Sequence, residues 1–148
     1  MNKAPFDAMD LARYVVDKCA REDEPVSNLL LQKILYFLQL VYCSATDGCL
    51  LFEDEFEAWP YGPVLPEVYF EYSYFGASPI DEQYDKFLLP DLSELGKFID
   101  DGIVDLRGKY PWDLVRSSHA VGSPWWIVRQ AGGSVIDNSL IIAAATKG

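Results

Sequence analysis

One almost uninterrupted apolar stretch constrains the fold of this chain more than any other part of its sequence. Between Leu29 and Cys43, every residue is apolar or aromatic except Gln32, Lys33 and Gln39. The stretch is shorter than the roughly 20 apolar residues that a membrane-spanning helix needs, and a lysine within it would be costly there. A helix with so few polar positions must instead be covered around most of its circumference by other elements of the fold.

The flanking residues define the ends of this central helix. Ser27 is a favourable N-cap, and Gly48 can adopt the positive φ that often follows a helix, which predicts a helix over about residues 28–45. Further helices are expected where cap residues, helix-starting prolines and apolar residues at helical spacing occur. They are a first helix after an Asp7 cap, one from Pro66, short ones at 81–89 and 112–118, a longer one over 92–106, and two that follow Ser123 and Asp137.

The segment after the central helix has a different period. Residues 55–59 alternate polar and apolar side chains, which is typical of a half-buried strand, and Pro60–Pro63 then predicts a rigid turn. A length of 148 residues suits one domain. The sequence therefore predicts a mainly α fold, α+β at most. We expect a compact single domain over residues 1–148, built around the buried helix of about 28–45, with a small strand element near 52–65.

Negative charge is concentrated in one part of the chain. There are 23 Asp and Glu against 12 Lys and Arg, a net charge of −11, and residues 53–94 hold eleven of the acids with one base, Lys86. This acidity argues against binding to a nucleic acid or an anionic membrane surface, and it would attract a basic protein. Residues 53–94 also hold ten of the 21 aromatic side chains. Two interpretations stay open: a solvated acidic face over an aromatic core, or a recognition surface with aromatic anchors.

The cysteines and the N-terminus limit the chemistry and the compartment that can be expected. Cys19, Cys43 and Cys49 form no CxxC motif and the chain has one histidine, so neither a disulfide framework nor a metal site is expected, and no motif indicates a cofactor. Three thiols suit a reducing compartment, and the first residues show no apolar run after a basic start. A cytoplasmic location is expected.

His119 is the one candidate for acid–base catalysis. Ser117, Ser118 and Ser123 lie near it in the sequence and Asp113 is six residues before it, so a small hydrolase using His119 is one alternative. No GxSxG turn that would expose a nucleophilic serine is present. A structural or contact role for His119 is therefore favoured, and the chain is not expected to be an enzyme.

Three segments, taken together and in order, resemble the Panacea domain. Leu31–Gln39 (LQKILYFLQ) is similar to the LQKLLYYAQ helix of that family, and Leu51–Val64 (LFEDEFEAWPYGPV) is similar to its LF-x5-AW-x2-GPV stretch. Ser117–Trp125 (SSHAVGSPW) resembles its LTH-x3-SPW motif. The family includes SocA-like antitoxins and phage-associated GepA-like proteins, and order and spacing agree over roughly residues 8–142.

The resemblance implies a mainly helical antitoxin that neutralises a cognate protein toxin, encoded by the adjacent gene, through direct protein–protein binding. It also implies an alternative, an adaptor that delivers the toxin to a cytoplasmic protease. The resemblance does not separate residues that touch a toxin from residues that hold the fold. The positions it singles out as toxin-binding or motif residues are Gln32, Lys33, Tyr36, Trp59, Tyr61, Gly62, Pro63, His119, Pro124 and Trp125.

Overall fold

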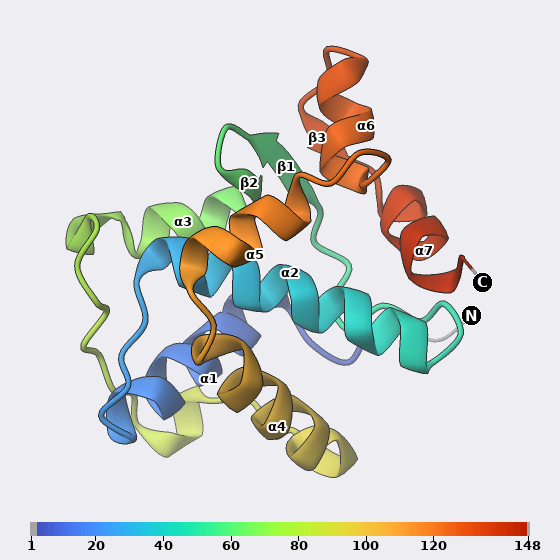
Figure 1. Cartoon of the computed structure of the whole chain (residues 1–148). Helices are drawn as coiled ribbons and strands as arrows, with labels where there is room; N and C mark the ends of the chain where they lie inside the picture. Colours follow the sequence, from blue (N-terminus) through green and yellow to red (C-terminus); the bar gives the residue numbers. More distant parts are fainter. Residues whose placement is uncertain (1–2, 148) are drawn as a thin grey trace.

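Helix α2 (Asn28–Ala45) runs through the middle of the computed structural model, which describes residues 3–147 (Figure 1). The Ser27 hydroxyl caps this helix by accepting a hydrogen bond of 3.2 Å from the backbone N–H of Leu30. The prediction of a buried central helix over about residues 28–45 is confirmed. The elements that contact α2 are α1 (Ala8–Arg21), α3 (Pro66–Glu71), α4 (Gly96–Arg107), α5 (Pro111–Ser118), α7 (Asn138–Thr146) and strand β2 (Gly62–Val64).

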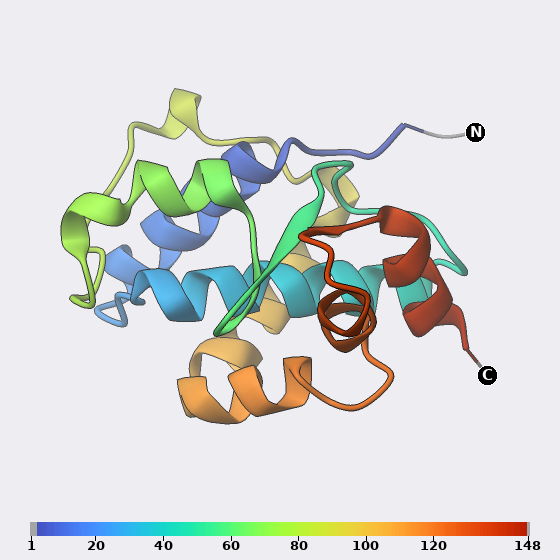
Figure 2. The same ribbon diagram turned by 90° about the horizontal axis from the view of Figure 1, so that it is seen from above.

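The surrounding elements cover α2 from different sides. In Figure 1, α1 and α4 lie below α2 and the strands lie above it. Seen from above, α3 and α5 lie on opposite sides of α2, and α6 (Pro124–Gln130) and α7 lie toward its C-terminal end (Figure 2). Leu31, Ile34 and Leu35 of α2 are completely buried by this arrangement. The helix is therefore the centre of the hydrophobic core, as its composition requires.

A small antiparallel sheet is the only strand element within residues 3–147. Its strand order is β2-β1-β3, where β1 is Phe56–Trp59 and β3 is Val135–Ile136. Trp59 pairs with Gly62 across the β1–β2 turn, and Phe56 pairs with Ile136 of β3. The prediction of a mainly α fold with a small strand element near 52–65 is confirmed, while β3 was not foreseen.

The three polar residues of the apolar stretch hold this strand region onto α2. Gln32, Lys33 and Gln39 are each at most 1% exposed. The Gln39 amide donates to the carbonyl oxygen of Phe52 at 2.8 Å and accepts from the N–H of Leu51 at 2.7 Å. Buried polar groups need such partners, since an unpaired one costs about 1–3 kcal/mol. The polar positions in the helix therefore fix where the following segment lies.

The start of α1 differs from the prediction in its cap. Asp7 occupies the N-cap position, but its side chain accepts no hydrogen bond from the helix. The backbone N–H of Ala8 donates instead to the Asp54 carboxylate at 3.0 Å. A residue 46 positions later in the chain thus satisfies one of the free N–H groups in the first turn of the helix.

The prediction of a helix at 81–89 is largely wrong. Only a single 3₁₀ turn forms there, at Lys86–Leu88. The backbone N–H of Tyr84 donates to Asp17 and its carbonyl accepts from Arg21, both at 2.8 Å, so side chains of α1 take the groups that a helix would use. The remaining 3₁₀ turns are Ser73–Phe75, after α3, and Ser93–Leu95, before α4.

Candidate functional site

The three segments that carry the family resemblance meet at the β1–β2 hairpin. From α2, the Lys33 ammonium donates to the carbonyl oxygen of Pro63 at 3.0 Å. From α6, the Trp125 indole N–H donates to the carbonyl oxygen of Trp59 at 2.7 Å. The side-chain amide of Gln32 accepts from the N–H of Leu65 at 2.9 Å. These contacts hold the hairpin between the central helix and the α5–α6 corner.

Gly62 lies in the β1–β2 turn, where side chains from two of these segments approach its backbone closely. Its φ is +110°, a conformation that L side chains rarely adopt. A Cβ at this position would lie 2.7 Å from Cε of Lys33 and 2.7 Å from Oγ of Ser118. The conformation and the space therefore both require glycine.

Lys33 is a buried cation with a carbonyl as its hydrogen-bond acceptor. Its side chain is 0% exposed, and within residues 3–147 it forms no ion pair. Burial disfavours the charged form and lowers the pKa of Lys33 from 10.5 to about 7. Lys33 therefore positions the hairpin at an electrostatic cost.

His119 packs against an aromatic ring and is not hydrogen-bonded to a neighbouring serine or aspartate. Its ring stacks on Trp125 with centroids 3.7 Å apart, and its Nε2 is buried without a hydrogen-bond partner in the described part of the chain. Burial first, and then the positive charges of Lys33 and Arg129, lower the pKa of His119. The neighbouring serine hydroxyls form hydrogen bonds with the backbone and not with the imidazole. Ser118 donates to the carbonyl oxygen of Val115, and Ser123 donates to the carbonyl oxygen of Ser118. Asp113 forms an ion pair with Arg116.

The remaining motif residues divide into buried and accessible ones. Tyr36 is 1% exposed and its ring meets Phe56 edge-to-face, and burial raises the pKa of its hydroxyl. Pro124 is buried at the start of α6. In contrast, Tyr61 is 60% exposed and Trp59 is half-buried. The singled-out positions are therefore mostly supports of the hairpin, and Tyr61 is the most exposed of them.

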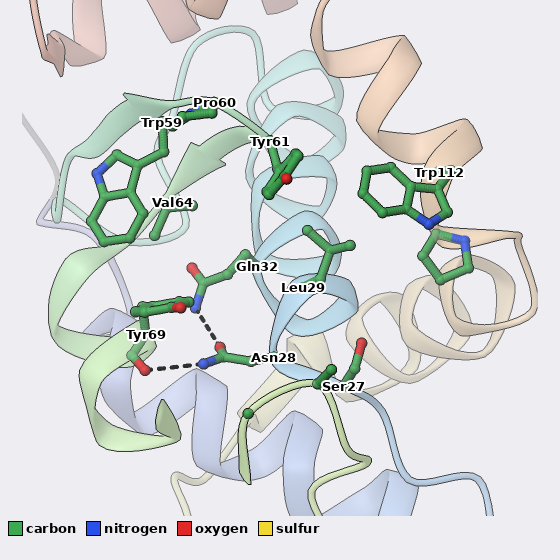
Figure 3. Close-up of a pocket in the computed structure, with 13 residues that line it drawn as sticks. Ser27, Asn28, Leu29, Gln32, Trp59, Pro60, Tyr61, Val64, Tyr69 and Trp112 are labelled. Atoms are coloured by element: carbon green, nitrogen blue, oxygen red, sulfur yellow. Dashed lines mark hydrogen bonds between the residues drawn. The ribbon is translucent and has the colours of Figure 1, made fainter. Parts of the chain in front are cut away.

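An apolar groove lies beside the hairpin, between α2, α3 and the start of α5. Its volume is about 660 Å³. In Figure 3, Trp59 and Tyr69 lie on one side of the groove and Tyr61 and Trp112 on the other, with Gln32 of α2 between the two pairs and Leu29 of α2 beside Tyr61. The ring centroids are 5.1 Å apart for Trp59–Tyr69 and 5.4 Å apart for Tyr61–Trp112. The lining residues are Ser27, Asn28, Leu29, Gln32, Trp59, Pro60, Tyr61, Val64, Tyr69, Gly76, Ala77, Pro111 and Trp112.

Three important lining residues were missed by the sequence analysis. Leu29, Tyr69 and Trp112 come from three elements, and no spacing in the sequence shows that these elements meet. One signal was present for Trp112: it follows Pro111 at the first turn of a short helix, where a large apolar side chain has little helix of its own to pack against. It is 41% exposed in the fold.

The acidic segment of residues 53–94 is not neutralised by the rest of the fold. Every ion pair in the described part of the chain uses an acid outside this segment. Five of its eleven acids accept hydrogen bonds from N–H groups instead: Glu53, Asp54, Glu55, Glu57 and Asp91. The excess negative charge of the segment therefore remains available to an external partner.

Other kinds of site find no support in the described residues. Within residues 3–147, no group of three or more His, Cys, Asp or Glu side chains is arranged to hold a metal ion. Cys19 and Cys43 are buried, Cys49 is exposed, and all three are free. None of the described helices combines the length and the apolar character that crossing a membrane requires.

Comparison with known proteins places the chain in a family. A family model described as "Antitoxin SocA-like, Panacea domain" matches residues 31–126, which include all three motif segments. The chain is 33% identical over 138 residues to a protein named "Antitoxin SocA" from Caulobacter vibrioides (strain NA1000 / CB15N), covering 86% of this chain and 73% of that relative. No solved structure gave a significant match. The chain thus belongs to the family of SocA-like antitoxins with a Panacea domain.

Proposed function

We propose that this chain is an antitoxin that neutralises a cognate protein toxin by binding it directly. Its membership of the SocA-like antitoxin family supports the antitoxin role. The observation that carries direct binding is the open aromatic groove next to an acidic segment that forms no ion pair within residues 3–147. Exposed aromatic side chains provide anchors for a partner, and uncompensated charge provides long-range attraction.

The proposed partner is the product of the adjacent gene, a toxin with a basic surface. Binding requires no catalytic step from this chain, and the packing of His119 on Trp125 supports a structural role for that residue. The free thiols of Cys19, Cys43 and Cys49 suit action in a reducing cytoplasm.

Co-expression tests the proposal in cells. The product of the adjacent gene is expressed alone and together with this chain, and growth and complex formation are measured. We expect growth arrest with the partner alone, normal growth with both, and co-purification of the two proteins. If the adjacent product is harmless alone, or if growth recovers without any complex, direct neutralisation is the wrong function.

Salt dependence tests the role of the acidic segment. We expect the association rate with the toxin to fall clearly from low to high ionic strength, because screening removes the attraction between exposed charges. Replacing Glu67→Gln and Glu71→Gln together is expected to slow association at low salt and to weaken its salt dependence. Asp7→Asn with Asp47→Asn removes the same charge from exposed residues outside 53–94, and this control is expected to change association less. Stopped-flow measurement of both variants decides the point, and equal effects would contradict a localised role.

A further inference from the structure

We propose that the groove beside the hairpin holds an apolar or aromatic anchor side chain of the toxin, which is flanked on the toxin by Lys or Arg residues. This inference rests on the proposed function and adds the chemistry of the bound segment. The groove of about 660 Å³ falls within the size range of clefts that bind ligands through an apolar surface.

The anchor is apolar because the polar groups at the base of the groove are already used. Oε1 of Gln32 accepts from Leu65 N–H, and its Nε2 donates to Oδ1 of Asn28 at 3.0 Å. Nδ2 of Asn28 in turn donates to the carbonyl oxygen of Tyr69 at 3.0 Å (Figure 3). A side chain that enters here meets paired amides, aromatic rings and the aliphatic surface of Leu29, so an apolar group is favoured.

Basic residues are expected around the anchor because elements that form the groove wall carry uncompensated carboxylates. Oε1 of Glu57 accepts from the Trp59 indole N–H at 2.9 Å, so this carboxylate contacts a wall residue without itself lining the groove. Glu67 and Glu71 are exposed on α3, the helix that carries the wall residue Tyr69, although neither carboxylate lines the groove itself. None of the three forms an ion pair within residues 3–147. The faces of the wall tryptophans and tyrosines add attraction for Lys or Arg.

The same charges argue against two other occupants. A second copy of this chain would bring another segment of net charge −10 against the first, and like charges across an interface are unfavourable. A nucleic acid would bring phosphates to the same carboxylates. Charge complementarity therefore selects a basic protein segment.

Shortening two exposed side chains that line the groove tests this docking mode. The double variant Tyr61→Ala, Trp112→Ala removes two aromatic side chains of the groove. Tyr61 is 60% exposed and Trp112 is 41% exposed. With the purified product of the adjacent gene as the probe, we expect at least about tenfold weaker binding, mainly through faster dissociation. Tyr74→Ala is the matched control, because Tyr74 is 92% exposed in the same acidic segment but does not line the groove. The control is expected to bind as the wild type does.

A charge variant keeps the test informative if the double truncation disturbs the fold. Tyr61→Arg places a positive charge where basic residues of the toxin are expected, so it should weaken binding more at low salt than at high salt. Unchanged binding by folded Tyr61→Arg and by the double truncation, or equal weakening by Tyr74→Ala, would overturn the docking mode. Dimers of this chain that dissociate in the double truncation would overturn it as well.

The outcomes separate this inference from the proposed function. If the wild-type chain fails to bind the probe and fails to protect cells, the proposed function itself is wrong. If the wild type binds and protects, and both groove variants do so equally well, the antitoxin function stands and the docking site is elsewhere.

Discussion

Replacing Gly62 by alanine is expected to lower the free energy of unfolding by about 4 kcal/mol. The positive φ of +110° accounts for part of this loss, because a residue with a Cβ in such a conformation costs about 1–3 kcal/mol. Steric overlap accounts for the rest, because the new Cβ would meet Lys33 Cε and Ser118 Oγ at 2.7 Å, and overpacking costs about 1–3 kcal/mol. Urea denaturation followed by circular dichroism measures the sum.

Gly48→Ala is the control that separates the two causes. Gly48 has a similar φ of +107°, but a Cβ there would meet its nearest neighbour, Cγ2 of Ile142, at an ordinary 3.7 Å. This control is therefore expected to show the conformational cost alone, and to unfold at a higher urea concentration than Gly62→Ala. Equal losses in the two variants would show that α2 and α5 do not press on the hairpin turn as described.

Replacing Lys33 by methionine is expected to change how stability depends on pH. Burial lowers the pKa of Lys33 from 10.5 to about 7 in the folded protein, whereas the unfolded chain keeps the higher value. Between these two pH values the unfolded state binds a proton that the folded state lacks. The free energy of unfolding of the wild type should therefore rise with pH over this interval, by up to about 1.4 kcal/mol per pH unit.

Lys33→Met removes this contribution. From about pH 7 to about pH 9.5, the wild type is expected to gain about 3 kcal/mol of stability relative to the variant. Tyr and Cys groups that titrate at high pH are the same in both proteins, so their effects cancel in the difference. Lys86→Met, at an exposed lysine, is the control and should follow the wild type. Parallel curves for the wild type and Lys33→Met would contradict a buried lysine with a lowered pKa.

Much of the fold could be predicted because its strongest signals are local. The apolar stretch that starts at Leu29 has too few polar positions for a surface helix, and the structure buries it at the centre. The Ser27 and Ser123 caps accept hydrogen bonds from N–H groups three residues later, as their types predict. The residues before Pro60, which alternate between polar and apolar side chains, likewise form a strand that leads into a tight hairpin.

The elements that could not be predicted depend on contacts between distant parts of the chain. Strand β3 has two residues and is a strand only because β1 pairs with it. The helix expected at 81–89 is absent because Asp17 and Arg21 of α1 bind the backbone of Tyr84. The Asp7 side chain makes no cap on α1, and the distant Asp54 accepts from the first N–H of that helix. In each case hydrogen bonds between distant parts of the chain decide the local structure.

The candidate site was predicted in part, for a related reason. The motif segments were identified as a set, but their side chains have two different roles. Lys33, Gly62 and Trp125 hold the hairpin in place, and this became visible only from the 3.0 Å bond to Pro63, the space around Gly62 and the bond from Trp125 to Trp59. The groove additionally needs Trp112, which no motif contained. Most residues of the three motif segments therefore hold the hairpin in place, and fewer of them line the proposed docking surface.

Inhibition of the purified toxin by the purified chain, with no protease present, tests direct neutralisation most directly. The activity of the adjacent gene's product is measured while this chain is added in increasing amounts. We expect toxin activity to fall to zero at a fixed molar ratio, and the two proteins to elute together as one complex. A toxin that keeps its full activity at a large excess of this chain would contradict it, and protection of cells would then require another route, such as delivery to a protease.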